Sequence, residues 1–294
     1  MNRLAPVRAL VVLAAISLIL WFTPLRNTLY LALHQDGYTH ILLIVPAAAA
    51  LIFLDRRTLS TNPQWSAVGI ALLAVALALG AIAKWGRINP PSDVRLAISM
   101  TGLVLWWIGS FVLCFGLKGL RSFLFPLLFL FWMVPMPAVV MNRTVGWLQQ
   151  GSAATTQMLF EAARVPVSRR GVDLVIPGIE IEVASECSSI RSSVILVVTT
   201  MILAHLFLRS PRRKLLVVAT AVPLSIAKNG LRIFIIAMIG THFDPAFLTG
   251  WFHHHGGIFF FLIALAAICV LLWILRRGEE RALQRRPLRL VNSA

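Results

Sequence analysis

Charged residues are scarce in this sequence, and acidic ones are the scarcest. Only 13% of the 294 residues are charged, and 11 acidic residues stand against 27 basic ones. The hydrophobic fraction is 59% and the mean hydropathy is +0.83, which a soluble core of this size could not accommodate. The composition excludes an ordinary soluble domain and predicts an all-α polytopic membrane protein.

The sequence also lacks internal repeats, low-complexity tracts and the HExxH pattern of zinc peptidases. It has three cysteines. Cys114 and Cys269 stand inside apolar runs, where a cysteine usually serves as a small buried hydrophobe. Cys187 differs, because a glutamate and two serines flank it. It is the only one of the three that we consider as a reactive thiol.

Eight stretches are apolar enough to cross a bilayer, which takes about 20 mostly apolar residues each. They cover residues 9–25, 39–54, 66–83, 96–117, 122–141, 189–208, 214–240 and 256–275. We interpret the first as a retained anchor, since many spans follow it and no clear signal-peptide cleavage site appears. We expect one domain over residues 1–294, with an extracytoplasmic segment at about 142–186 and a basic tail at about 276–294.

Lys and Arg set the expected orientation, because cytoplasmic loops carry an excess of them. A cytoplasmic N-terminus puts 16 of the 27 basic residues inside, among them the run from Arg209 to Lys214. The even number of spans returns the C-terminus to the cytoplasm of a cell (inner) membrane protein. We attribute the net charge of +16 to this topology and to contact with anionic membrane lipid, and we expect no nucleic-acid partner.

The extracytoplasmic segment has two halves. Thr144 to Val165 mixes apolar and polar residues in an amphipathic pattern that suits the membrane interface. Val172 to Val183 alternates apolar and polar residues around Pro177-Gly178, which predicts a short β-hairpin. That hairpin leads directly to Cys187.

Cys187 begins a predicted helix at the outer mouth of the sixth span. A thiol in the first turn of a helix lies at the positive end of the helix dipole, which raises its thiolate fraction. Ser185 or Ser188 can cap this helix, and Arg191 shares the face of Cys187 four residues on. These features favour Cys187 as a nucleophile.

Arg232 lies within the seventh span, between apolar neighbours. A charge inside a span costs at least about 2.5 kcal/mol by insertion scales, so such residues face the protein interior and are functional by default. Asn229, three residues earlier, can share its face. Because this span runs outward, Arg232 falls at a depth that Cys187 can reach.

Three consecutive histidines, His253 to His255, begin the eighth span. Successive side chains on a helix turn by about 100°, so at most one of them is expected to point towards Cys187. A metal site is the alternative, but no second set of ligands has the right spacing except the isolated His242 and Asp244. We therefore expect neither a metal nor another cofactor.

These blocks resemble the exosortase/archaeosortase family over essentially the whole length of the chain. The matching stretches are Tyr38-Thr39-His40, Phe125-Pro126-Leu127-Leu128-Phe129, Val134-Pro135-Met136-Pro137, Glu186-Cys187-Ser188-Ser189-Ile190-Arg191-Ser192, Asn229-Gly230-Leu231-Arg232-Ile233, and Gly250-Trp251-Phe252-His253 with Gly257. The resemblance implies Cys187 as nucleophile, Arg232 as oxyanion or thiolate stabiliser and His253 as general acid/base. Auxiliary roles fall to Glu186, Arg191, Asn229 and His254, which stands where the family often has an acid. Two roles stay open for Arg191: it anchors substrate, or it holds the oxyanion in place of Arg232.

The resemblance also implies a substrate. We expect an intramembrane cysteine protease or transpeptidase that cleaves C-terminal sorting signals of exported proteins at the outer face. Such a signal comprises a motif such as Pro-Glu-Pro, one span and a basic tail, and the product is released by hydrolysis or passed to a surface glycan or lipid acceptor. The alternatives are a transporter or channel, lined by Lys228, Arg232 and His205, and a non-enzymatic assembly factor for surface polysaccharide export.

Overall fold

The structure is a computed structural model that describes residues 5–56, 66–85, 90–177, 179–182, 190–242 and 251–291. The chain forms two compact units, Met1–Met141 and Asn142–Ala294. Within the described residues, six helices are long and apolar enough to cross a membrane, and the number rises to eight if each of two bent helix pairs is one span. The predicted all-α polytopic membrane fold is confirmed, with spans close to the expected positions.

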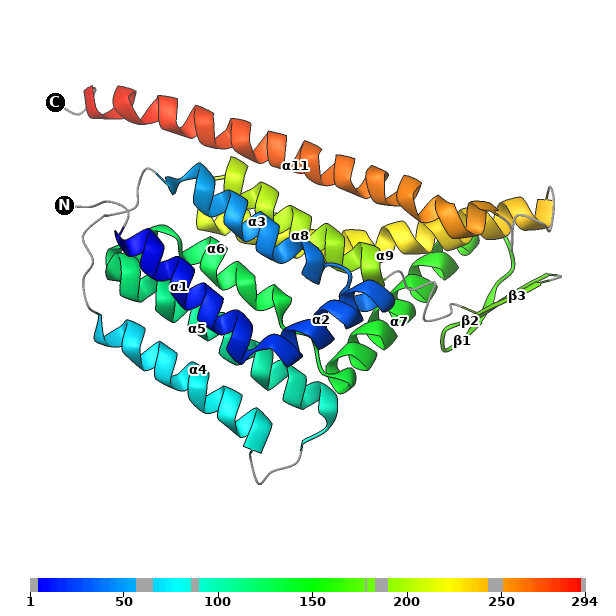
Figure 1. Ribbon diagram of the computed structural model, residues 1–294. Coiled ribbons are helices and arrows are strands. Elements are labelled where there is room, and N and C mark those ends of the chain that lie inside the picture. Colours follow the sequence, from blue (N-terminus) through cyan, green and yellow to red (C-terminus); the bar gives the residue numbers. More distant parts are fainter. Residues whose placement is uncertain are drawn as a thin grey trace. The chain divides into compact units, whose positions relative to one another are not determined.

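In the described residues of the first unit, helices are the only regular secondary structure (Figure 1). Its elements are α1 (Ala5–Leu20), α2 (Phe22–His34), η1 (Asp36–Tyr38), α3 (Ile41–Leu54), α4 (Ala67–Trp85), α5 (Ser92–Ser122), α6 (Leu124–Phe129) and η3 (Leu130–Met133). α5 is the most buried of the candidate spans, and α4 packs along it. Glycines allow this close approach: a Cβ added at Gly69 would lie 3.0 Å from the backbone nitrogen of Leu113.

The first predicted span, residues 9–25, is broken in the structure. α1 ends at Leu20 and α2 leaves at 79° to it. Pro24 explains the break, because it has no N–H to donate to the carbonyl of Leu20 and its ring would clash with that carbonyl in a continuous helix. Trp21 fills the corner with 2% exposure, and its ring packs against Trp106 at a centroid distance of 5.6 Å.

The fifth predicted span, residues 122–141, is also broken. η3 ends at Met133, and α7 (Ala138–Ala162) departs at 95°. Val134 and Met136 each precede a proline, which disfavours the helical conformation, and Val134 is extended at φ −72° and ψ 119°. The new helix is capped across the chain, because the Ala138 N–H donates to Asp93 Oδ2 at 2.7 Å.

The second unit contains most of α7, three short strands and three long helices (Figure 1). They are β1 (Ser168–Arg170), β2 (Asp173–Ile176), β3 (Ile179–Glu182), α8 (Ile190–Phe207), α9 (Pro211–His242) and α11 (Trp251–Val291). α8, α9 and α11 share one apolar core, to which α11 contributes Ala264, Ile268 and Leu272 at four-residue spacing. Other apolar residues of α11 are exposed and form a surface suited to lipid, namely Leu262, Ile263, Val270, Trp273 and Ile274.

Cys269 corrects one sequence-based expectation. Cys114 is buried as expected, but Cys269 is exposed. Its neighbour Ile268 occupies the core position of α11, and the next residue on a helix points about 100° away. An apolar run inside a span therefore does not ensure burial in protein, because the run also supplies the lipid-facing side.

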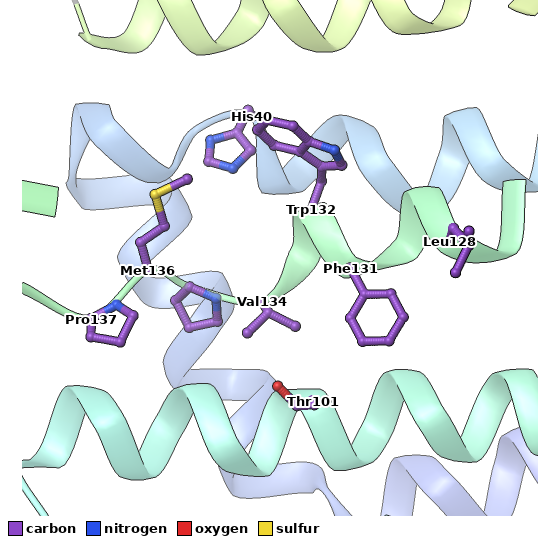
Figure 2. A pocket seen from close by; sticks show the side chains of 9 residues that line it. His40, Thr101, Leu128, Phe131, Trp132, Val134, Met136 and Pro137 are labelled. Carbon is purple, nitrogen blue, oxygen red and sulfur yellow. The ribbon is translucent and has the colours of Figure 1, made fainter. Parts of the chain in front are cut away.

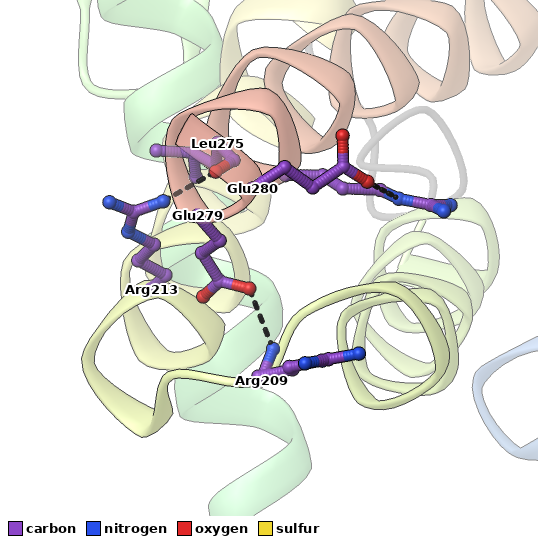
Figure 3. Close-up of polar contacts among 6 residues, drawn as sticks. Arg209, Arg213, Leu275, Glu279 and Glu280 are labelled. Atoms are coloured by element: carbon purple, nitrogen blue, oxygen red, sulfur yellow. Dashed lines mark hydrogen bonds and ion pairs between the residues drawn. The ribbon is translucent and has the colours of Figure 1, made fainter. Parts of the chain in front are cut away.

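A polar clamp fixes α11 to the connection between α8 and α9 (Figure 3). Glu279 accepts hydrogen bonds from the backbone N–H groups of Arg209 and Ser210, both at 2.9 Å. Arg213 donates in the other direction, from Nη1 to the Leu275 carbonyl at 2.5 Å. The Glu279 carboxylate thus accepts hydrogen bonds from two backbone amides that precede α9. These amides belong to the basic run that the sequence predicts to be cytoplasmic.

Candidate active site

The predicted nucleophile lies between two described elements of the second unit. β3 ends at Glu182 and α8 begins at Ile190, and both Glu186 and Cys187 lie outside the described residues. Their roles stay predictions. Arg191 is in the first turn of α8 and is exposed.

The three-stranded sheet positions the chain just ahead of the Cys187 segment. β2 and β3 pair antiparallel, with Asp173 opposite Glu182 and Ile176 opposite Ile179. The predicted hairpin at Pro177-Gly178 is therefore confirmed, and β1 extends it by one strand that the sequence pattern missed. Leu174 is fully buried in a cluster that includes Ile233 of α9, so the hairpin is anchored next to Arg232.

One turn of α9, Lys228 to Arg232, is locked against α7. Asn229 is 2% exposed, and its amide donates to Ser152 Oγ at 2.9 Å. Thr156 Oγ1 donates to the Gly230 carbonyl at 3.1 Å. The contact is so close that a Cβ at Gly230 would lie 2.6 Å from the Thr155 Cβ, so only glycine fits there. These contacts fix the turn of α9 that carries Asn229 against α7.

Arg232 extends from this locked turn towards α11. Its Nη1 lies 3.7 Å from the position of a Cβ added at Gly257, so the guanidinium lies over that glycine. Gly257 follows His253 by four residues in the same helix, about one turn or 6 Å along the axis. The fold thus brings the arginine block of α9 to the glycine that ends the histidine block. His253 and His254 belong to the described helix, although their side chains lie outside the described set.

Lys228, considered above only for the transporter or channel alternative, lies in the same turn of α9 as Asn229. It is 6% exposed, and its Nζ donates a hydrogen bond to Ser192 Oγ in the first helical turn of α8. It precedes Arg232 by four residues, so the two cations share one face of α9. The signal in the sequence was the spacing of two basic residues by one helical turn inside a span. The hydrogen-bond partner Ser192, 36 residues away in the chain, could not be predicted from the sequence.

No metal-binding cluster forms in the part of the chain that the structure describes. Within those residues, no three His, Cys, Asp or Glu side chains come together as ligands. This statement does not include the three consecutive histidines, because their side chains lie outside the described set.

The first unit has a pocket of about 420 Å³ at the outer end of α3 in the predicted topology (Figure 2). Its lining is mostly apolar, and His40 and Thr101 are its polar members. His40 is 3% exposed and meets the Trp132 ring edge to face, with the centroids 6.3 Å apart. Tyr38 braces the wall, because its hydroxyl donates to the Met136 carbonyl at 2.8 Å. Three of the sequence blocks quoted above thus meet at this pocket, because Leu128 also lines it.

The family comparison covers both units. A family model described as transmembrane exosortase matches residues 30–270 of the chain. No curated protein and no solved structure matches it. The matched range includes all three blocks with predicted catalytic residues.

Proposed function

Because the chain belongs to the transmembrane exosortase family, a family of membrane cysteine peptidases, we propose that it cleaves C-terminal sorting signals of exported proteins through a thioester. Family membership and the multi-pass helical fold establish a protease-like membrane protein in general terms. The proposal adds the substrate, the outer-face site and the residue roles. The substrate is an exported protein ending in a Pro-Glu-Pro-like motif, one span and a basic tail.

The position of Arg232 is the observation that carries this proposal. Its guanidinium lies over Gly257, one turn beyond His253, and it emerges from a turn that Asn229 and Gly230 fix to α7. Two of the three predicted catalytic blocks are therefore neighbours, although the chain separates them by about twenty residues. A guanidinium held at a defined place, next to the start of a helix that carries imidazoles, suits charge stabilisation during acyl transfer.

The proposed reaction proceeds in two steps. The Cys187 thiolate attacks the scissile carbonyl carbon, and Arg232 stabilises the oxyanion that forms. The C–N bond then breaks as His253 protonates the leaving amine, which leaves a thioester on Cys187. His253 next removes a proton from water or an acceptor hydroxyl or amine, which attacks the thioester and restores the thiolate.

The auxiliary residues support this scheme. Asn229 positions the Arg232 turn through Ser152. Arg191 is exposed in the first turn of α8, and we assign it the role of anchoring substrate. Glu186 and His254 flank the nucleophile and the acid/base in sequence, and we assign them supporting roles in orientation.

The small sheet offers a way to bind the signal. In the described residues the strand order is β1-β2-β3, so β3 is an edge strand, and its last residue is five positions before Cys187. An extended peptide can add to such an edge through backbone hydrogen bonds. This would deliver the motif towards the thiol, while the span and basic tail of the signal lie in the membrane and the anionic inner surface.

A reporter protein tests the proposed function directly. The reporter is an exported protein with a Pro-Glu-Pro motif, about 20 apolar residues and an Arg-rich tail. Co-expression with this chain should shorten it, as measured by immunoblot with tags on both sides of the motif. A matched reporter with alanines in place of the motif should stay intact. Equal cleavage of both reporters, or of neither, would contradict the substrate assignment.

The orientation of the site gives a second prediction. In a background in which all three cysteines are replaced by alanine, Arg169→Cys in β1 should react with an impermeant maleimide on intact spheroplasts. Arg212→Cys at the start of α9 should react only after permeabilisation, because the basic run is expected inside. Both arginines are exposed, so accessibility within the protein is matched. Reversed labelling would place the site on the cytoplasmic face of the membrane and contradict the proposed function.

The histidines give a third prediction. His253→Ala should abolish reporter cleavage, because the proposed proton transfer uses this side chain alone, whereas His254→Ala and His255→Ala should give partial losses. Chelators should have no effect. Equal loss at all three positions, together with recovery on adding zinc, would instead indicate a metal site.

A further inference from the structure

Lys228 is a buried cation that the proposed reaction does not use. It lies in a candidate span and is 6% exposed, in a setting where a charged side chain is costly. A methionine or leucine would fill the same space without that cost. The presence of an ammonium group there calls for a function beyond packing.

The contacts of Lys228 connect the first turn of α8 to the Arg232 turn of α9. Its Nζ donates to Ser192 Oγ on α8, whereas its neighbours Asn229 and Gly230 bind α7. The α9 backbone is thereby fixed on one side, and the ammonium ties the first described turn after the Cys187 segment to that fixed point. Ser192 follows Cys187 by five residues in the sequence.

Lys228 also acts on Arg232 through charge. Residues four apart on a helix are neighbours, with Cβ atoms about 5–6 Å apart, and like charges at this spacing repel. Lys228 is bonded to α8 and the Arg232 guanidinium lies over Gly257 of α11, so the repulsion acts between two cations that contact different helices. Lys228 is thus bonded to the first turn of α8 and lies one helical turn before Arg232.

We propose that Lys228, through Ser192 and Arg232, is a positioning residue: it fixes the first turn of α8, which begins three residues after Cys187 in the sequence, relative to the guanidinium proposed to stabilise the oxyanion. The proposal rests on the function proposed above for Cys187 and Arg232. It assigns Lys228 no contact with substrate. Its removal should therefore slow the chemical step and leave substrate binding nearly unchanged.

The kinetic test uses reporter cleavage by purified protein in lipid nanodiscs. Lys228→Met should lower kcat by about 10- to 100-fold, with KM changed less than about 3-fold. Ser192→Ala should cause a smaller loss of the same kind. The double variant should be no slower than Lys228→Met alone, because the two residues share one interaction. Lys214→Met, at the other end of α9, is the matched control and should keep wild-type rates.

Four outcomes would overturn the proposal. An unchanged kcat in Lys228→Met would show that the lysine has no role in the chemical step. A rise in KM alone would make it a substrate contact. Losses that multiply in the double variant would show that Ser192 and Lys228 act independently. A lower melting temperature matched by a lower fraction of folded enzyme would identify a structural role instead.

A second measurement keeps this test separate from the reporter. With Cys114 and Cys269 replaced by alanine, the rate of alkylation by iodoacetamide reports on Cys187 alone. Lys228→Met should lower that rate several-fold at neutral pH. The substitution removes the Lys228 ammonium and releases the Arg232 guanidinium from its fixed direction, and fewer nearby positive charges lower the thiolate fraction of Cys187. Lys214→Met should not. If the wild type fails to cleave the reporter, the proposed substrate is wrong, and an alkylation rate unaffected by Lys228→Met would still reject the positioning role.

Discussion

Cys187→Ser and Cys187→Ala should both abolish reporter cleavage, and both variants should stay in the membrane at wild-type abundance. This is the largest effect that we expect. A serine hydroxyl is far less ionised than a thiol near neutral pH, so it cannot replace a thiolate nucleophile without a dedicated base. The measurement is the fraction of cleaved reporter at matched enzyme abundance.

The matched control is Cys269→Ser. Cys269 is exposed on the outward face of α11, so the same substitution there should leave cleavage unchanged. Near wild-type cleavage in Cys187→Ser would remove the thioester mechanism and favour the non-enzymatic alternative. A covalent intermediate gives a further check: hydroxylamine should release a reporter adduct from wild-type protein and none from Cys187→Ala.

The membrane spans were predictable because their physical requirement is simple. A bilayer demands about 20 apolar residues in a row, and the sequence supplies them at almost the positions that the helices occupy. The two breaks were missed because hydropathy does not record backbone geometry. Pro24 and the prolines at 135 and 137 were visible in the sequence, but the bends of 79° and 95° depend on how the following helices pack.

Strand β1 shows a different limit. Its sequence, Ser168 to Arg170, has no alternation of apolar and polar residues, and all three residues are exposed. It forms because β2 offers a backbone edge, with Arg169 opposite Leu174. β2 and β3 were predictable, because alternation places Leu174 and Ile176 on the face that packs against α7 and α9.

The candidate site, like the fold, was predictable from the sequence only in part. Topology alone placed Arg232 and the histidines at one end of adjacent spans, and the structure adds that Arg232 reaches Gly257. The link from Lys228 to Ser192 joins residues on two helices, and no local pattern reports it. Residue types and depth are thus readable from sequence, whereas the contacts that position them require the packed helices.

Arg232→Lys is expected to give the second-largest loss. A lysine keeps the charge in the span but replaces a planar fork of donors with one ammonium on a different stem. Membrane abundance should therefore change little, while the rate of reporter cleavage falls by about 10²–10³-fold, the loss of about 3–4 kcal/mol seen when an oxyanion-hole donor is removed.

Two arginines serve as controls for this substitution. Arg213→Lys lies on the same helix, where the arginine donates to the Leu275 carbonyl, so it tests whether α9 tolerates the exchange outside the site. Arg191→Lys, exposed in the first turn of α8, should lose less activity than Arg232→Lys. The rate must be measured in membranes at equal enzyme abundance. Full activity in Arg232→Lys, or a loss explained wholly by degraded protein, would reassign Arg232 to a structural role, and the proximity of its guanidinium to Gly257 would then be a feature of helix packing alone.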